Sequence, residues 1–158
     1  MFGTLSGDEI EALLHGQLIG RIGCHKDNVT YVVPISYAYD GEFVYAITRE
    51  GLKIDIMRNN RQVCFEVEDI PDLANWKTAI CWGEYEELPN RTERHHALEL
   101  LHDRHLPQVT SATTKLSPSW PFKPNEIDSI KGVVFRIRIN KKTGKYEKQE
   151  NAIVFSWG

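Results

Sequence analysis

Two runs of β-branched and aromatic residues flank the dipeptide Asp40-Gly41, and this pattern constrains the fold more than any other. Asp-Gly accepts the positive φ values of a two-residue type I′ turn, so the pattern predicts a β-hairpin over residues 31–48. In that register the opposed pairs are Tyr39 and Glu42, Tyr37 and Val44, Ile35 and Ala46, and Val33 and Thr48, all on one face. Pro34 cannot donate to a ladder, which predicts a sheet edge, a bulge, or a strand beside a bound planar ligand.

The residues after this hairpin have the pattern of an anion-binding site. Thr48 ends the second run, Gly51 provides a turn, and a helical pattern follows. The start of a helix presents free N–H groups and the positive end of its dipole, and Arg49 and Lys53 add positive charge. An ordinary connection between strand and helix, with solvated basic side chains, explains the same pattern. Glu50 opposes an anion unless its side chain points away.

The whole chain has the properties of a globular, non-basic protein. Its 158 residues predict a single domain over 1–158, and a net charge of −3 gives no reason to expect nucleic acid or an anionic membrane as a partner. Three separated cysteines without a CxxC pair predict thiols of a reducing compartment. Acidic residues occupy the N-terminus where a signal peptide is apolar, so we expect a cytoplasmic protein.

Outside the hairpin, sequence patterns predict several short elements. A capping-box spacing at Ser6 predicts a helix ending at Gly16, and alternation predicts strands over residues 18–25, 62–68 and 75–88. A helix is expected over 90–105, and a closing hairpin is expected from 132–139 and 146–157 around a turn at 141–144. About six strands with little helical interleaving favour a mainly β fold with short helices, an antiparallel Greek-key-like barrel.

Four histidines lie on the expected helix, at positions 95, 96, 102 and 105. His95 and His102 are two turns apart, roughly 10 Å, which is too far for one metal ion. His102 and His105 could share an ion, but no third ligand is evident nearby. We interpret the histidines as a solvated helix face and predict no metal site.

The sequence contains no motif of a hydrolase or a nucleotide-binding loop: GxSxG, HExxH, Walker and GxGxxG patterns are missing. An anion site without visible catalytic side chains is typical of a protein whose chemistry belongs to a cofactor. The proline-rich stretch 107–124 carries Trp120 and Phe122. It either covers a ligand or a partner subunit, or packs on its own core.

Three blocks, taken in order, resemble the pyridoxamine 5′-phosphate oxidase-related flavin-binding proteins, and are closest to their nitroimidazole-resistance-like branch. The blocks are GRIGC at 20–24, YVVPISYAYDGEFVYAITREGLKIDIMRNNRQVCFEVED at 31–69, and NWKTAICWGEYEEL at 75–88. The resemblance covers residues 5–88 well and the last third weakly. It implies an FMN-binding split barrel, usually a homodimer with FMN at the subunit interface.

The resemblance also implies which residues bind the cofactor. The flavin ring is expected along the strand 33–36, and its phosphate at the strand end and helix start that match Thr48 and Lys53. Residues 76–78 are expected to add contacts, and an aromatic loop of the neighbouring subunit to cover the ring. The cofactor-binding set is Val33, Pro34, Ile35, Ser36, Ala46, Thr48, Gly51, Lys53, Trp76, Lys77, Thr78 and Trp120.

Two departures from the family pattern bear on activity. Nitroimidazole-resistance proteins commonly have a histidine in the strand that here reads YAIT at 45–48, and the C-terminal NAIVFSWG lacks the arginine-bearing substrate signature of true pyridoxamine phosphate oxidases. We expect an FMN-dependent oxidoreductase that passes electrons to a small-molecule acceptor, with no catalytic side chain assigned. The alternatives are a flavin-binding or sensing module without turnover, and a nitroimidazole-reductase-like resistance protein. FMN, FAD and a deazaflavin are not distinguished.

Overall fold

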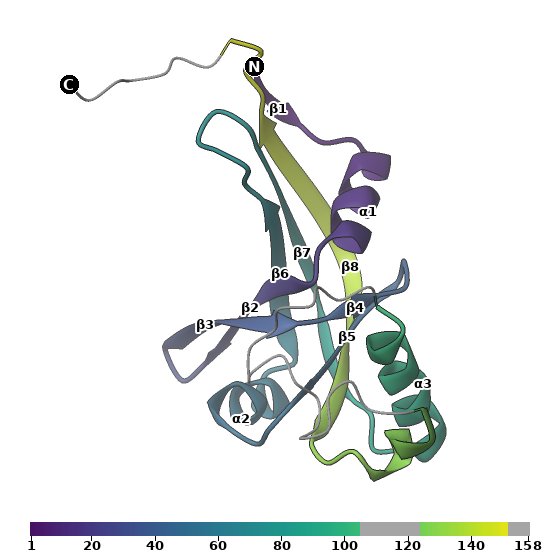
Figure 1. Cartoon of the computed structure of the whole chain (residues 1–158). Helices are drawn as coiled ribbons and strands as arrows, with labels where there is room; N and C mark the ends of the chain where they lie inside the picture. Colours follow the sequence, from purple (N-terminus) through teal and green to yellow (C-terminus); the bar gives the residue numbers. More distant parts are fainter. Residues whose placement is uncertain (105–123, 152–158) are drawn as a thin grey trace, which may run out of the picture.

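A computed structural model describes residues 1–104 and 124–151 of the chain. Within these ranges eight antiparallel strands form one strongly curled sheet in the order β3-β2-β6-β7-β8-β5-β4, with β1 added beside β8 (Figure 1). The prediction of a mainly β antiparallel fold with short helices is confirmed. The strands are β1 (Phe2–Thr4), β2 (Ile19–Lys26), β3 (Val29–Ser36), β4 (Ala38–Tyr39), β5 (Phe43–Thr48), β6 (Gln62–Asp69), β7 (Trp76–Glu87) and β8 (Val133–Glu147).

Three α-helices and one 3₁₀ turn pack on this sheet in the described part of the chain. They are α1 (Gly7–Gly16), α2 (Leu52–Asn59), α3 (Arg91–His102) and η1 (Pro124–Ser129). The predicted capping box of α1 is present: the Ser6 hydroxyl accepts a hydrogen bond from the Glu9 N–H, and the Glu9 carboxylate accepts one from the Ser6 N–H. None of these helices is long and apolar enough to cross a membrane.

The central hairpin forms with a register different from the predicted one. Tyr39 lies opposite Val44 rather than Glu42. The Asp40 carboxylate explains the difference, because it accepts hydrogen bonds from the N–H groups of Glu42 (2.9 Å) and of the next residue (2.7 Å). This local side-chain bonding moves the turn one residue along, and Gly41 adopts the positive φ of +99° that the turn needs. Each residue of the first strand therefore pairs two positions further along the second strand, and because side chains alternate with a period of two, every side chain stays on its predicted face.

The first half of the predicted hairpin pairs elsewhere. The strand β3 runs along β2 for its whole length, so the expected pairs of Val33 with Thr48 and of Ile35 with Ala46 are wrong. The chain crosses between the two sheet edges at Tyr37, whose N–H donates to the Leu18 carbonyl (3.0 Å) and whose hydroxyl donates to the Leu14 carbonyl (2.6 Å). The strand β3 is an edge of the sheet, which is one of the three settings predicted from Pro34.

Two hydrophobic cores lie on opposite faces of the hairpin. Alternate residues of β5 enter each of them: Val44 and Ala46 join the core beneath α1 and α2, whereas Phe43 and Tyr45 join the core beneath α3. The face assignment made from the sequence is therefore correct. Because both faces are buried over Phe43–Ala46, this strand is mainly apolar instead of alternating between apolar and polar residues.

The closing hairpin predicted around residues 141–144 is absent, because β8 runs straight through them while paired with β7. Gly144 serves close packing there instead of a turn. A Cβ atom at this position would lie 2.8 Å from Leu5 Cδ1 and 2.9 Å from Ile10 Cγ1, so the missing side chain makes room for the start of the chain. The long predicted strand over 75–88 is confirmed as β7, with an irregularity between Trp82 and Gly83.

Candidate functional site

The first turn of α2 is open, as an anion site requires. Its N-cap is Gly51, and no side chain caps the turn. The first intrahelical bond runs from the Asp55 N–H to the Gly51 carbonyl at 3.1 Å. Because the first N–H groups of a helix have no partner within it, this end presents unused backbone donors.

Two basic side chains beside this turn carry no compensating charge. Neither Arg49 nor Lys53 forms a hydrogen bond or an ion pair with any residue that the structure describes. Lys53 is half-buried, and burial lowers the pKa of its ammonium group. A cation that is partly removed from water and has no carboxylate partner is stabilised by an anion that binds beside it.

Glu50, which opposed this assignment at the sequence level, is already paired. Its carboxylate accepts two hydrogen bonds from the Arg58 guanidinium, at 2.8 and 2.9 Å. The ion pair fixes Glu50 on the last turn of α2 and offsets its charge. The carboxylate that opposed an anion at this end of β5 and α2 therefore has a partner of its own, and the anion site stays a prediction.

The expected ring-binding strand β3 is accessible in part. Val33 and Ser36 are half-buried and Pro34 is exposed, whereas Ile35 points into the core. Ala46, on β5, is fully buried, so its methyl group contributes to the core. Thr48 is half-buried at the end of β5.

Ser36 has a charged neighbour that sequence reasoning missed. Arg104, just beyond α3, donates from Nη1 to Ser36 Oγ (2.6 Å) and to the Tyr37 carbonyl (2.8 Å). Burial lowers the pKa of Arg104 to about 10, and its Nη2 atom is buried without a hydrogen-bond acceptor among the described residues. No sequence signal marks this residue, because a basic side chain near a helix C-terminus is common on any surface.

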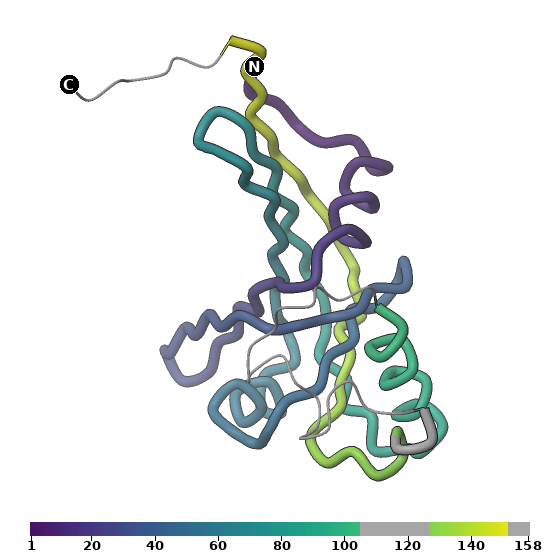
Figure 2. Tube along the Cα trace, viewed as in Figure 1, coloured from purple at the N-terminus to yellow at the C-terminus, as the bar shows by residue number. Residues whose placement is uncertain are grey.

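Residues 76–78 lie far from α2 within one chain. Figure 1 places the start of β7 at the β6–β7 hairpin, at the opposite end of the molecule from α2, and the trace in Figure 2 shows the same separation. The Trp76 indole donates to Glu147 (3.0 Å), the Thr78 hydroxyl donates to Glu66 (3.0 Å), and Lys77 is exposed. Trp120 lies outside the described residues.

The helix histidines are engaged with acids and aromatic rings. His95 contacts Asp128 (3.0 Å) and Glu99 (3.1 Å), and the hydrogen bond to Asp128 raises the pKa of this imidazole. His96 packs edge-on against Tyr45. Among residues 1–104 and 124–151, no three His, Cys, Asp or Glu side chains are placed to hold a metal ion. His105 lies outside the described residues.

The three cysteines are free thiols, in agreement with the sequence prediction. Cys24 and Cys81 are buried, and burial raises the pKa of Cys81 to about 12. A thiol with such a pKa is not a nucleophile near neutral pH.

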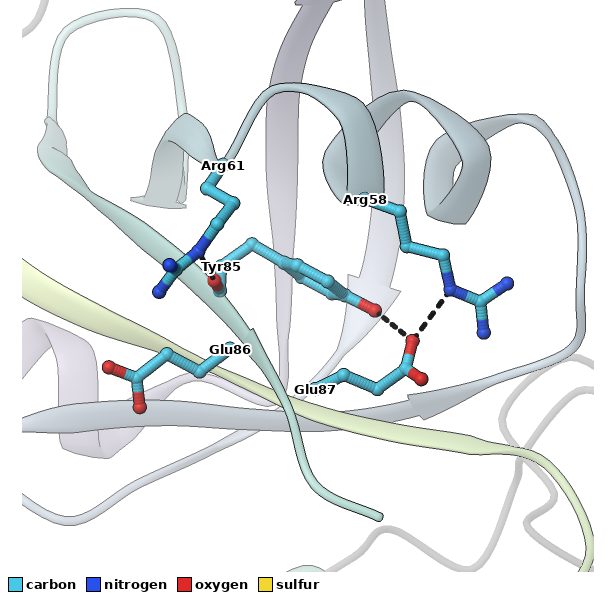
Figure 3. A pocket seen from close by; sticks show the side chains of 5 residues that line it. All are labelled: Arg58, Arg61, Tyr85, Glu86 and Glu87. Atoms are coloured by element: carbon cyan, nitrogen blue, oxygen red, sulfur yellow. Dashed lines mark hydrogen bonds and ion pairs between the residues drawn. The ribbon is translucent and has the colours of Figure 1, made fainter.

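An open hollow of about 460 Å³ lies beside the C-terminal end of α2 and is lined by Arg58, Arg61, Tyr85, Glu86 and Glu87 (Figure 3). Its two carboxylates are already paired, Glu86 with Arg136 and Arg138, and Glu87 with Arg58. Glu87 accepts from Arg58 (2.8 Å) and from the Tyr85 hydroxyl (2.7 Å), as Figure 3 shows. Arg61 donates to the Tyr85 carbonyl (3.0 Å) and has no acidic partner among the described residues, but the two carboxylates of this hollow oppose an anionic ligand.

Residues 6–146 match the family described as pyridoxamine 5′-phosphate oxidase. The chain is 33% identical over 93 residues to an uncharacterized protein, RA0666, of Rhizobium meliloti (strain 1021); the match spans 59% of this chain and 62% of that protein, less than two thirds of its length. A FAD-binding protein from Mesorhizobium loti superposes with a TM-score of 0.72 at 31% identity, covering 94% of this chain and 99% of that chain. A candidate 5-nitroimidazole antibiotic resistance protein from Bacteroides thetaiotaomicron superposes with a TM-score of 0.69 at 18% identity, covering 92% and 87%, and at that identity shows the fold alone.

Proposed function

The chain belongs to the pyridoxamine 5′-phosphate oxidase family, and we propose from this premise that it is a flavoprotein that passes electrons through FMN to a small-molecule acceptor. The family match and the superposition with the Mesorhizobium loti protein identify the curled sheet as a split barrel. The observation that carries the proposal is the open first turn of α2 with two cations beside it, Arg49 and Lys53, that have no partner in the described part of the chain.

The residues present fit a flavin nucleotide in two places. The phosphate is held at Thr48, Gly51 and Lys53, where free N–H groups and positive charge coincide. The ring lies along β3, where Arg104 beside Ser36 presents a buried donor without an acceptor. When bound, the flavin supplies the electron-transfer chemistry, and these residues bind and orient it.

FMN is the proposed cofactor, because it is the flavin that the family resemblance implies and its single phosphate group suits the anion site. FAD is a second candidate, favoured by the FAD-binding relative at 31% identity. Both nucleotides present a phosphate to the start of α2 and a ring to β3. The mass of the ligand released from native protein distinguishes them.

We also propose a homodimer with the flavin at the subunit interface. The expected contacts at Trp76–Thr78 lie at the opposite end of the chain from α2, so a second copy must supply them if both groups touch one flavin. A partly exposed, mainly apolar row crosses four strands on the outward face of the sheet, and its members are Val32, Gly23, Cys64 and Trp82. Such a row is suited to burial against a partner.

The proposal is tested on protein purified without added cofactor. We expect a visible flavin absorption spectrum, a released ligand with the mass of FMN, and oxidation of NADH or NADPH when an electron acceptor is present. A colourless protein that shows no thermal shift with FMN or FAD contradicts flavin binding. A flavin-loaded protein that turns over neither nicotinamide donor supports the alternative of a flavin-binding or sensing module.

A further inference from the structure

Arg104 is held by three neutral acceptors and leaves one nitrogen unused. Its Nε donates to the Leu101 carbonyl (2.9 Å), and its Nη1 donates to Ser36 Oγ and the Tyr37 carbonyl. Nη2 is buried, and no residue in 1–104 or 124–151 accepts a hydrogen bond from it. These bonds fix the plane of the guanidinium, and therefore fix the direction in which Nη2 points.

This arrangement is costly for a purely structural arginine. A buried donor without an acceptor and a buried charge without a carboxylate both oppose folding. Arg136, whose side chain is 20% exposed, is instead matched by Glu86 at 2.7 Å. The contrast leaves Arg104 Nη2 as a buried donor whose acceptor is not among the described residues.

The position of Arg104 specifies which part of a ligand it meets. Ser36 ends β3, the strand proposed to lie along the flavin ring, whereas the phosphate is assigned to the start of α2. We infer that Arg104 Nη2 donates a hydrogen bond to a carbonyl oxygen or ring nitrogen on the polar edge of the bound flavin and that its charge favours the reduced ring. This inference rests on the proposed function and adds a residue that determines affinity and redox potential.

The inference predicts three measurable effects of Arg104→Met. The flavin-free variant keeps or gains thermal stability, because the change removes an uncompensated buried charge. The Kd for FMN rises by about tenfold to a hundredfold, the effect of losing a charge-assisted hydrogen bond. The midpoint potential of the bound flavin becomes more negative, because a nearby positive charge no longer stabilises the reduced, more negatively charged ring. Arg104→Lys keeps the charge and restores part of the potential.

The experiment uses full-length protein, stripped of cofactor and titrated with FMN, with calorimetric affinity, thermal denaturation and spectroelectrochemical potential as readouts. Arg91→Met is the control: it removes a positive charge from the other end of α3, where Arg91 is exposed and paired with Asp128. We expect the control to match wild type in affinity and in potential.

The outcomes separate this inference from the proposed function. Wild-type protein that binds no flavin contradicts both. Wild-type protein that binds FMN, with an Arg104→Met variant of equal affinity and potential, overturns the inference and leaves the flavin assignment intact. Strong destabilisation of the flavin-free variant shows that Arg104 has a structural role, and it overturns the inference. Lower affinity with an unchanged potential shows that Arg104 does not contact the flavin ring, and it also overturns the inference.

Discussion

Replacing Lys53 with alanine tests the phosphate site most directly. Lys53 is half-buried beside the open start of α2 and has no acidic partner among the described residues, so its charge is available to a ligand. A hydrogen bond to a charged group contributes about 1.5 to 3 kcal/mol. We therefore expect Lys53→Ala to raise the Kd for FMN by roughly 10- to 150-fold, measured by calorimetry or by quenching of flavin fluorescence.

The matched control for this experiment is Lys26→Ala. Lys26 is also partly buried near α2, but Asp55 already pairs with it at 3.5 Å. Its removal should change affinity far less than the loss of Lys53. Equal affinity of Lys53→Ala and wild type would refute the assignment, and Arg49 and Lys77 would then be tested as phosphate ligands.

The pH dependence gives an independent check on Lys53. Burial lowers the pKa of its ammonium group in the free protein, and a bound phosphate raises that pKa again because opposite charges favour the protonated form. Binding above the lowered pKa therefore takes up a proton. The Kd for FMN should rise as the pH increases through that pKa, and Lys53→Ala should lose this rise. A wild-type Kd that stays constant throughout the alkaline range contradicts this explanation.

Three further predictions concern the fold and the assembly. Gly144→Ala should destabilise the protein by about 1 to 3 kcal/mol in chemical denaturation, because a Cβ there meets core side chains at 2.8 Å; an unchanged midpoint contradicts the close packing. Burial raises the pKa of the Glu86 carboxyl, but hydrogen bonds from Arg138 and Arg136 outweigh this effect and lower the pKa below its ordinary value of 4.5. The stability advantage of wild type over Glu86→Gln should be present above pH 4.5 and disappear as the pH falls through the lowered pKa; an advantage that is the same at every pH argues against the ion pairs. Wild-type protein should have the mass of two chains in light scattering. Trp82→Glu, which places a charge on the outward apolar row, should shift the measured mass toward that of one chain. A monomeric wild type contradicts the proposed homodimer.

Some features of the candidate site depend on residues that are neighbours in sequence, and others depend on contacts between distant residues. Thr48, Gly51 and Lys53 are neighbours in sequence, so their approach to one another depends only on a strand, a turn and a helix start, which the residue pattern indicates. The acid that opposed the site, Glu50, was neutralised by Arg58 on the last turn of α2, and nothing in the order of residues predicted that bond. Arg104 reaches Ser36 across 68 positions of sequence, which no periodicity reports.

The sequence by itself determined the positions of most strands and helices and the face of the hairpin that each residue occupies, because these follow from periodicity and turn chemistry within a few residues. The tertiary structure decided the pairing. It placed β3 beside β2 instead of β5, and carried β8 through the residues that suggested a turn. The physical reason is that a strand takes its partner from whichever distant segment best buries its side chains, and that choice depends on contacts far apart in the chain.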